Sequence, residues 1–376
     1  MNPFPTSDSI LPTPPPESNL LSSSKATVYF PNPVHPIALE YAKSKFGRVI
    51  VNMNDHRGEV CDIEKDNDIL KVADGIVNRA NPLPKSFLEK CKNLKGISVV
   101  GVGYDSVDIA FCRNNKISVF ILHNFLLNGL LIVAMNSPDC PGINSTSVSE
   151  LTLTLTLCLL RKVTQLNNRI KSLAEGEKVL AIDNLGNELR GKKVGMIGMG
   201  NTARKTGELF HHAFECPLHI YSPTSPSNKW NSSDPSCQGA LPHTRHSNLE
   251  TLLPEIDILT IHCSLTLTTK DLITERQLRL MKSSAILINM SRGYVVNESD
   301  LYNALREGWI ASAASDVFQV EPVIRKCMNR LDELDNFIAT PHIGGSTVEA
   351  QIEICKCAID QLANYFDGYQ VKNRVC

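Results

Sequence analysis

Three side chains that together could carry out acid–base chemistry on a carbonyl group stand at the ends of successive apolar runs. Arg292 follows ILINMS, Glu321 follows ASDVFQV, and His342 follows IATP. A guanidinium can hold a carboxylate through two parallel hydrogen bonds. A carboxylate bonded to an imidazole stabilises the charged ring and raises its pKa above the usual value of about 6.5. Such an imidazolium can protonate a carbonyl oxygen.

Each of these residues also has an ordinary interpretation when it is taken alone. An isolated histidine such as His342 is more often a core or capping residue, and an isolated Arg292 more often forms a surface salt bridge. The set is more informative than its members, because the ends of parallel strands meet at one edge of a sheet, where open α/β sheets bind ligands. We therefore predict a carboxylate–imidazole pair beside an anion clamp.

A glycine-rich turn lies upstream, in VGMIGMGNTARKTGELF. Gly198 permits a tight turn, Gly200 lets the backbone approach a pyrophosphate, and Ala203 takes the place of the third glycine of the motif. The apolar run before the turn and the helical spacing after it match a strand–turn–helix unit, whose helix start offers N–H groups to phosphates. The turn predicts dinucleotide binding; alone it could be a structural glycine turn.

The residue at the end of the next apolar run bears on the choice of cofactor. NAD sites usually carry Asp or Glu about 20 residues after the glycines, whereas here LHIYS ends in Ser222. This position lacks a carboxylate that would repel a 2′-phosphate. The hydroxyls of Ser222, Thr224 and Ser225 could donate hydrogen bonds to such a phosphate. No arginine follows directly. The sequence therefore favours NADP over NAD.

These residues are spread over two series of alternating strands and helices, which predict parallel sheets covered on both faces. In the first series, ATVYF, RVIVNM, ADGIVNR and LKGISVVGVG are the expected strands, and PIALEYAKSKFG and SFLEKCKN the expected helices. In the second, the expected strands are KKVGMIG, LHIYS, IDILTIHCS, AILINMS and AASDVF.

The run LTLTLTLCLL alternates apolar residues with threonine, which by itself suggests a strand. Ser147 and Glu150 form the pattern of a capping box just before it, and the run continues into LLRKV, which is too long for a typical strand. We predict a long helix between the two series.

The bulk composition narrows the class of protein. The 376 residues are enough for two domains, and a net charge of −1 gives no general attraction to nucleic acid or to a membrane surface. The twelve cysteines are scattered without a CxxC pair, which favours free thiols in a reducing cytoplasm over disulfides or a metal site. We expect a Pro- and Ser-rich disordered leader at 1–24 and no targeting signal.

The motifs GMGNTA, NMSRG, DVFQVEP and TPHIGGST, in this order, resemble those of the D-isomer-specific 2-hydroxyacid dehydrogenase family. The resemblance extends from about residue 26 to the end and implies a homodimer. It implies a doubly wound α/β Rossmann domain at 144–341, inserted in a smaller flavodoxin-like substrate domain at 25–143 that is completed by 342–376. It also implies NAD(P)H-dependent reduction of a 2-oxo acid to the D-2-hydroxy acid.

The resemblance assigns a role to each motif residue. Arg292 would bind the 2-oxo acid, His342 would be the acid/base, and Glu321 would orient His342. The backbone amides of Val102 and Gly103 would receive the substrate carboxylate, and Asp316 would hold the nicotinamide carboxamide. The expected cofactor site comprises Gly198, Gly200, Asn201, Thr202, Ser222, Cys263, Met290, Asp316 and Gly344.

Short segments and single residues of this chain can be compared with those of particular subfamilies, which narrows the expected substrate and cofactor. The segments CSLT and NMSRG are similar to those of glyoxylate/hydroxypyruvate reductases, which use NADPH. Val99 stands where phosphoglycerate dehydrogenases carry Arg, which argues against a phosphorylated substrate. Glu321 stands where the formate dehydrogenases of the superfamily carry Gln, and Ser264 where many members carry Pro. The identity of the 2-oxo acid stays open.

The apolar run FILHNFLLNGLLIVA has no counterpart in the family, where a strand like KISV leads directly into a segment like NSPDCPGINSTSVSE. The insertion, Phe120–Met135, is shorter than the about 20 apolar residues of a membrane span and contains polar side chains. It is either an extra element near the hinge or a retained intron, and sequencing the transcript from Val119 to Asn136 distinguishes the two.

A second class of function shares these features. Corepressor-like proteins that sense dinucleotides can retain the Arg292–Glu321–His342 set, so the set does not exclude them. The sequence shows no basic patch or long interaction tail, which favours the enzyme.

Overall fold

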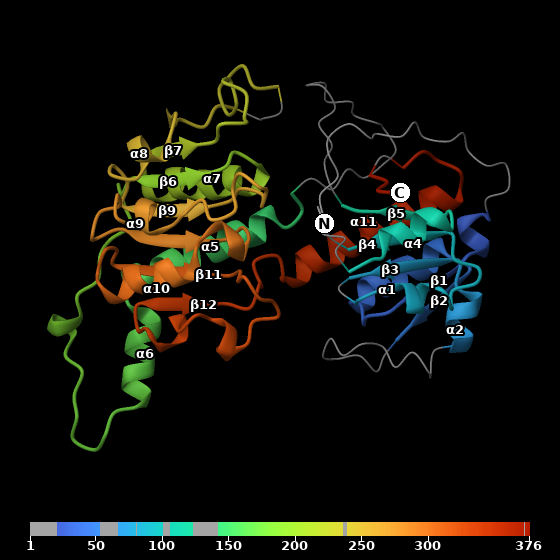
Figure 1. The fold of residues 1–376 in the computed structure, drawn as a ribbon, viewed down its shortest axis with the longest axis horizontal. Helices are drawn as coiled ribbons and strands as arrows, with labels where there is room; N and C mark the ends of the chain where they lie inside the picture. Colours follow the sequence, from blue (N-terminus) through green and yellow to red (C-terminus); the bar gives the residue numbers. More distant parts are fainter. Residues whose placement is uncertain are drawn as a thin grey trace. The chain divides into compact units, whose positions relative to one another are not determined.

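The computed structural model describes residues 21–52, 67–79, 81–100, 106–122, 142–235, 239–371 and 373–376. The chain divides into two compact units, which are treated separately below (Figure 1). Unit 1 comprises Met1–Pro141 and Gln351–Cys376, and unit 2 comprises Gly142–Ala350. The sequence placed the second boundary at 341/342, whereas unit 2 continues through Ala350, so that His342 belongs to the same unit as Arg292 and Glu321.

Unit 2 is built on a seven-stranded sheet of order β12-β11-β10-β9-β6-β7-β8, in which every pair of neighbours is parallel. The order reverses between β6 and β9, which is the switch point where doubly wound sheets bind their ligands. The strands are β6 (Val194–Ile197), β7 (Leu218–Tyr221), β8 (Thr244–His246), β9 (Ile258–Ile261), β10 (Ile286–Asn289), β11 (Ser312–Ser315) and β12 (Phe337–Ala339).

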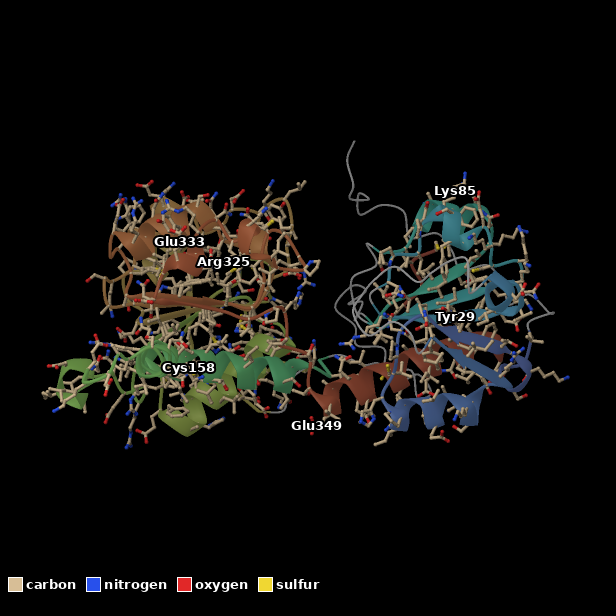
Figure 2. All side chains as sticks on the ribbon, turned by 90° about the horizontal axis from the view of Figure 1, so that it is seen from below. Tyr29, Lys85, Cys158, Arg325, Glu333 and Glu349 are labelled. Carbon is tan, nitrogen blue, oxygen red and sulfur yellow. The ribbon has the colours of Figure 1, made fainter. Side chains whose placement is uncertain are left out.

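Helices cover both faces of this sheet, as expected for buried parallel strands. One face packs against α5 (Ser145–Leu160) and α7 (Asn201–Phe214), and the other against α8 (Leu249–Leu252), α9 (Glu275–Leu278) and α10 (Glu298–Arg306). Figure 2 shows the two layers edge-on, with Cys158 of α5 on one side of the sheet and Arg325 on the other. The remaining elements are α6 (Val163–Lys171), η2 (Ala181–Asn184), η3 (Gly293–Val295), η4 (Arg325–Cys327) and η5 (Leu331–Glu333).

The Thr-rich run is helical, as the sequence predicted, and forms most of α5. The hydroxyls of Thr152, Thr154 and Thr156 each donate to the carbonyl four residues earlier, at 2.7, 2.8 and 2.8 Å. The predicted capping box is wrong, because Ser147 lies inside the helix and its hydroxyl contacts Thr347 at 2.8 Å. Apolar packing against the sheet, rather than a cap at Ser147, therefore stabilises a helix of otherwise modest propensity.

Unit 1 has a five-stranded parallel sheet of order β2-β1-β3-β4-β5, the flavodoxin-like arrangement that was predicted. Its elements are η1 (Ser23–Lys25), β1 (Thr27–Phe30), α1 (Pro36–Lys45), β2 (Arg48–Val51), α2 (Asn67–Val72), β3 (Gly75–Asn78), α3 (Lys85–Leu88), β4 (Gly96–Val99), α4 (Ile109–Asn114), β5 (Ser118–Phe120) and most of α11 (Val348–Phe366). With unit 2 inserted between its two segments, the predicted fold class is confirmed.

The first residues of the apolar run belong to the folded sheet of unit 1. Phe120 ends β5, and Ile121 and Leu122 are buried after it. The N–H of Ile121 donates to Asn373 O at 3.1 Å, and Gln361 Nε2 donates to Ile121 O at 3.1 Å. The first three residues of the expected insertion thus pack as part of unit 1, and the rest of it, 123–135, lies outside the described residues.

The cysteines depart from the sequence expectation at one position. Cys357 on α11 is disulfide-bonded, so the expectation of free thiols is wrong for this residue. Other described cysteines are free, including buried Cys91 and Cys112, whose pKa values burial raises to about 12. Such thiols are unreactive at neutral pH because the thiolate is the nucleophile.

Candidate active site

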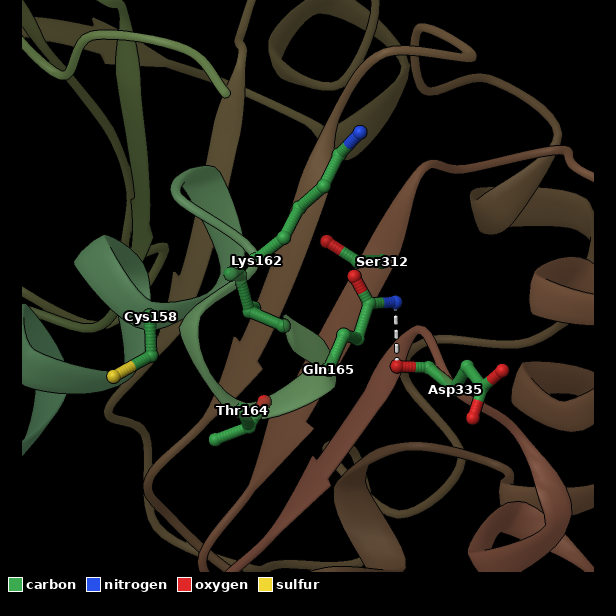
Figure 3. Close-up of a pocket in the computed structure, with 7 residues that line it drawn as sticks. Cys158, Lys162, Thr164, Gln165, Ser312 and Asp335 are labelled. Carbon is green, nitrogen blue, oxygen red and sulfur yellow. Dashed lines mark hydrogen bonds between the residues drawn. The ribbon is translucent and has the colours of Figure 1, made fainter. Parts of the chain in front are cut away.

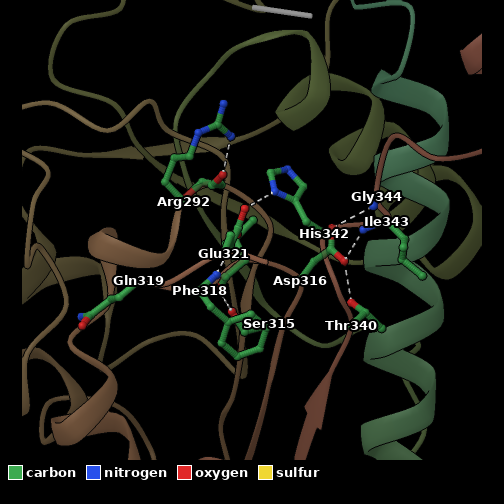
Figure 4. A network of polar contacts seen from close by, with 12 residues as sticks. Arg292, Ser315, Asp316, Phe318, Gln319, Glu321, Thr340, His342, Ile343 and Gly344 are labelled. Carbon is green, nitrogen blue, oxygen red and sulfur yellow. Dashed lines mark hydrogen bonds and ion pairs between the residues drawn. The ribbon is translucent and has the colours of Figure 1, made fainter. Parts of the chain in front are cut away.

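Three of the residues singled out by the sequence follow three adjacent strands of unit 2. Arg292 comes after β10, Asp316 directly after β11, and His342 after β12. Because these strands are neighbours and parallel, their carboxyl ends bring the three residues to one edge of the sheet. Figure 4 shows them together with Glu321, which lies in the loop after β11.

His342 and Glu321 form the predicted carboxylate–imidazole pair. His342 Nδ1 lies 2.7 Å from Glu321 Oε2, and the other oxygen, Oε1, accepts from the Phe318 N–H at 3.0 Å. An ionised carboxylate can only accept, so Nδ1 donates and Nε2 is the nitrogen that can give up or take a proton. The side chains are 46% and 34% exposed, so that solvent can exchange protons with the pair.

The pair shifts the protonation of both partners in the direction that general acid catalysis requires. The hydrogen bond from Glu321 raises the pKa of His342 above its ordinary value, against opposing contributions from burial and from Arg292. Burial would raise the pKa of Glu321, but the bonds from His342 and from the Phe318 N–H lower it overall. His342 therefore keeps its proton to a higher pH than an unpaired histidine would.

Replacing Glu321 with Gln should move the pH dependence of 2-oxo acid reduction. The role expected for His342 from the sequence is to donate the proton, so activity should fall as the pH rises through the pKa of that histidine. Without the carboxylate the pKa of His342 falls, and the alkaline limb of kcat/KM should shift to lower pH. Profiles of wild type and E321Q, with E333Q at an exposed glutamate as control, check this; an unmoved limb in E321Q would contradict the pairing.

Arg292 is placed beside this pair by tight backbone packing. Its Nη1 donates to Ser291 O at 2.7 Å, and its charge acts on both Glu321 and His342. The next residue, Gly293, leaves no room for a Cβ atom, which would overlap the backbone of Phe318 and Gln319. Gly293 thus fixes the distance between the arginine and the loop that carries Glu321.

Asp316 anchors the segment that carries His342. This buried carboxylate accepts from the Thr340 hydroxyl at 2.6 Å, the Ile343 N–H at 2.9 Å and the Gly344 N–H at 2.8 Å. His342 itself has a left-handed backbone with φ +56°, which a non-glycine residue adopts only when its surroundings enforce it. The three bonds supply that constraint. A carboxylate has about four acceptor positions, and these bonds use three of them. The expected contact of Asp316 with a carboxamide stays a prediction.

Glu298 is a supporting residue that the sequence analysis missed. It is buried in the first turn of α10 and accepts from the Gln319 N–H and from Asn329 Nδ2, both at 2.7 Å. Burial raises its pKa, against lowering by these bonds. The contact holds the loop between Asp316 and Glu321 in place. An acidic residue in a first helical turn is ordinary in a sequence, so nothing local identified it.

The expected dinucleotide turn lies between β6 and α7, at the switch point of the sheet. Gly198 has φ +104°, and a Cβ there would approach the carbonyl of His262 to 3.0 Å. A Cβ on Gly200, the residue that caps α7, would meet nothing within 4 Å, so the turn leaves open space in front of the helix. The N–H groups of the first turn, at Asn201 and Thr202, lack a capping side chain from Gly200. These features fit a pyrophosphate.

Three other residues expected in the cofactor site, Cys263, Met290 and Gly344, lie in loops that follow strands of the same sheet. Cys263 follows β9 and Met290 follows β10, next to the switch point, and burial raises the pKa of Cys263 to about 11. A Cβ on Gly344 would come within 2.9 Å of Asp316 Oδ2 and 3.3 Å of Met290 Cε. Val102 and Gly103 lie outside the described residues.

A second histidine at this edge has the opposite protonation behaviour. His262 follows β9, and its Nε2 lies 2.8 Å from the hydroxyl of Thr260. Burial lowers the pKa of His262 to about 3, so its ring is neutral at physiological pH. Of His262 and His342, only His342 is therefore suited to donate a proton.

One hollow elsewhere in unit 2 is too small to hold a substrate. A hollow of about 10 Å³ lies between the end of α5 and the start of β12, where Gln165 donates to Asp335 O at 2.6 Å (Figure 3). It has room for one water molecule at most. Within the described ranges no three His, Cys, Asp or Glu residues are grouped to hold a metal ion, and no described helix is long and apolar enough to cross a bilayer.

A doubly wound sheet with a glycine turn at its switch point and a carboxylate–imidazole pair at its carboxyl edge is typical of dinucleotide-dependent oxidoreductases. Comparison with known families specifies the class further. Residues 153–344 match the NAD-binding domain of the D-isomer specific 2-hydroxyacid dehydrogenases, and residues 28–126 match the catalytic domain. The chain belongs to this family of NAD(P)-dependent enzymes, as its motifs suggested.

Individual relatives agree with this assignment. The chain is 32% identical over 306 residues to glyoxylate/hydroxypyruvate reductase B of Yersinia pestis, covering 81% of this chain and 85% of that protein. The fold is similar to that of the Chlamydomonas reinhardtii pyruvate reductase (TM-score 0.74, 21% identity, 93% and 99% coverage). It is also similar to an NADPH-dependent glyoxylate/hydroxypyruvate reductase of Sinorhizobium meliloti (TM-score 0.70, 22% identity, 94% and 98% coverage).

Proposed function

We propose that the protein reduces a small 2-oxo acid of the glyoxylate or hydroxypyruvate type to the D-2-hydroxy acid, with NADPH as the preferred reductant. The observation that carries the proposal is the 2.7 Å bond between His342 and Glu321, within the field of Arg292. The Yersinia pestis relatives of this chain carry the name glyoxylate/hydroxypyruvate reductase B. They do not favour the dinucleotide-sensor alternative.

The side chains divide the work on the substrate. Arg292 binds and polarises the 2-oxo acid through charge-assisted hydrogen bonds. A bound dihydronicotinamide would supply the hydride to the keto carbon. His342 Nε2 gives its proton to the carbonyl oxygen, which becomes the hydroxyl of the product. Glu321 stabilises the imidazolium beforehand, and the exposed ring regains a proton from solvent.

The decisive experiment is an activity panel on the purified full chain. Consumption of NADPH and NADH would be followed with glyoxylate, hydroxypyruvate and bulkier 2-oxo acids, and the configuration of each chiral product would be determined. We expect turnover of the small acids, a D product and a higher kcat/KM with NADPH. Tight dinucleotide binding without turnover of any 2-oxo acid would favour the sensor instead.

We also propose that the chain forms a homodimer through an apolar surface on unit 2. The helix α6 has no buried residue, and with the segment 179–186 it frames a hollow of about 380 Å³. The exposed apolar side chains here are Val163, Ile170, Leu180, Ile182 and Leu185, which are 50–71% exposed. Apolar side chains gathered on one surface in this way indicate an interaction site, and a second copy of the chain is the proposed partner.

A double variant tests the dimer. I170D with L185D places two charges in the apolar surface, and burying them against a partner would be strongly unfavourable. We expect a folded monomer, with its mass measured by light scattering after size exclusion and its fold checked by circular dichroism. The variant I37D, at a residue of similar exposure (53%) on α1, should remain dimeric. A monomeric wild type, or a dimer that survives the double substitution, contradicts this assembly.

A further inference from the structure

The loop that follows β7 is folded around the guanidinium of an arginine from the neighbouring strand. Arg245 lies on β8, where its register partner on β7 is Ile220. Its Nη2 donates to Ser222 O at 2.8 Å and to Ser225 O at 3.1 Å, and its Nη1 donates to Pro226 O at 2.5 Å. Arg245, 23 residues after Ser222 in the chain, thus brings a positive charge to the loop that directly follows β7.

The charge of Arg245 is not neutralised by these contacts. Within the described part of the chain its three bonds all go to backbone carbonyls, which are dipoles and carry no net negative charge. The three bonds use three of its five N–H donors. Two donors and most of a positive charge therefore remain for an anion.

The hydroxyls beside this guanidinium are already gathered. Ser222 is buried at the end of β7, and its Oγ lies 2.8 Å from Ser225 Oγ. In doubly wound domains the end of this strand is where the adenosine ribose of a dinucleotide is held. Two hydroxyls and a guanidinium in this position suit a phosphate monoester, whereas a free ribose diol is usually held by a carboxylate.

We propose that Arg245 is the cation that selects a 2′-phosphorylated dinucleotide, with Ser222 and Ser225 as hydrogen-bond donors to the same phosphate. The inference rests on the proposed use of a nicotinamide dinucleotide and names the residue that sets the preference. It also resolves a difficulty in the sequence, where no arginine follows Ser222: parallel pairing of β7 with β8 brings one from the next strand.

The test measures binding to the intact protein without turnover. Calorimetry with adenosine 2′,5′-bisphosphate and with adenosine 5′-monophosphate isolates the contribution of the 2′-phosphate. In R245Q we expect a roughly tenfold or greater loss of affinity for the bisphosphate, as for a lost charge-assisted bond, and less than about a twofold change for the monophosphate. R190Q, at an exposed arginine before β6, should change neither.

Several outcomes would overturn the assignment. If R245Q weakens both nucleotides equally, Arg245 only supports the loop; if it weakens neither, Arg245 has no part in binding. Equal wild-type affinity for both nucleotides, with 2-oxo acid reduction intact, also refutes the selectivity and leaves the proposed function standing. Failure of the wild type to bind either nucleotide would contradict both proposals.

A second variant covers the case in which R245Q does not fold. S222D places a carboxylate beside the guanidinium, where it neutralises Arg245 and repels a 2′-phosphate. We expect the preference to invert, so that the monophosphate binds at least as tightly as the bisphosphate and kcat/KM becomes higher with NADH than with NADPH. Retained preference for the bisphosphate in S222D would refute the role of this loop.

Discussion

Glutamine in place of His342 is expected to lower kcat for 2-oxo acid reduction by about 10²–10⁴-fold, the usual contribution of a general acid. The amide of glutamine can still bond to Glu321 Oε2, which His342 Nδ1 reaches at 2.7 Å, but it has no proton to transfer at neutral pH. Steady-state kinetics with glyoxylate or hydroxypyruvate measure the loss.

The same variant should leave cofactor binding nearly intact. The glycine turn and α7 follow β6, and His342 follows β12, at the far end of the strand order. Dissociation constants for NADPH, measured by fluorescence, should agree within about twofold between wild type and H342Q. Unchanged turnover in H342Q would show that another group donates the proton.

Alanine in place of Asp316 should reduce both stability and catalysis. It removes three hydrogen bonds from the segment that carries His342 and leaves the buried Gly344 N–H without its acceptor. Unpaired buried donors cost about 1–3 kcal/mol each, so we expect the free energy of unfolding to fall by about 2–4 kcal/mol. Because a 1 Å displacement can cost about 10²-fold in rate, kcat should fall by about 10–10².

Two comparisons separate these effects. D316N retains one acceptor oxygen and should lose less stability and less activity than D316A, while D68A, at an exposed aspartate of α2, should match wild type in both. Denaturant unfolding gives the stability and initial rates give kcat, measured well below the melting temperature. A destabilised D316A with wild-type kcat would show that the bonds to Asp316 do not position His342.

Sequence and structure agree on the elements whose patterns are local. The apolar runs at β1, β6, β9 and β10 were identified because short buried parallel strands are rich in Val, Ile and Leu, and the glycine turn because its spacing reflects backbone geometry. The strand β8 was missed. It has three residues at an edge of the sheet, and its sequence TRH has no apolar pattern to detect.

The sequence by itself determined the family and the two α/β units, and it singled out the proposed acid–base residues, because those depend on residue type and on chain order. Only the tertiary structure decided which side chains support them. Glu298 holds the Glu321 loop, Asp316 is bonded to the His342 segment, and Arg245 reaches the loop after Ser222. These contacts join residues 21–28 positions apart, and parallel strands bring their carboxyl ends together whatever lies between them in the chain. No local pattern records such a pairing, so only the fold could reveal it.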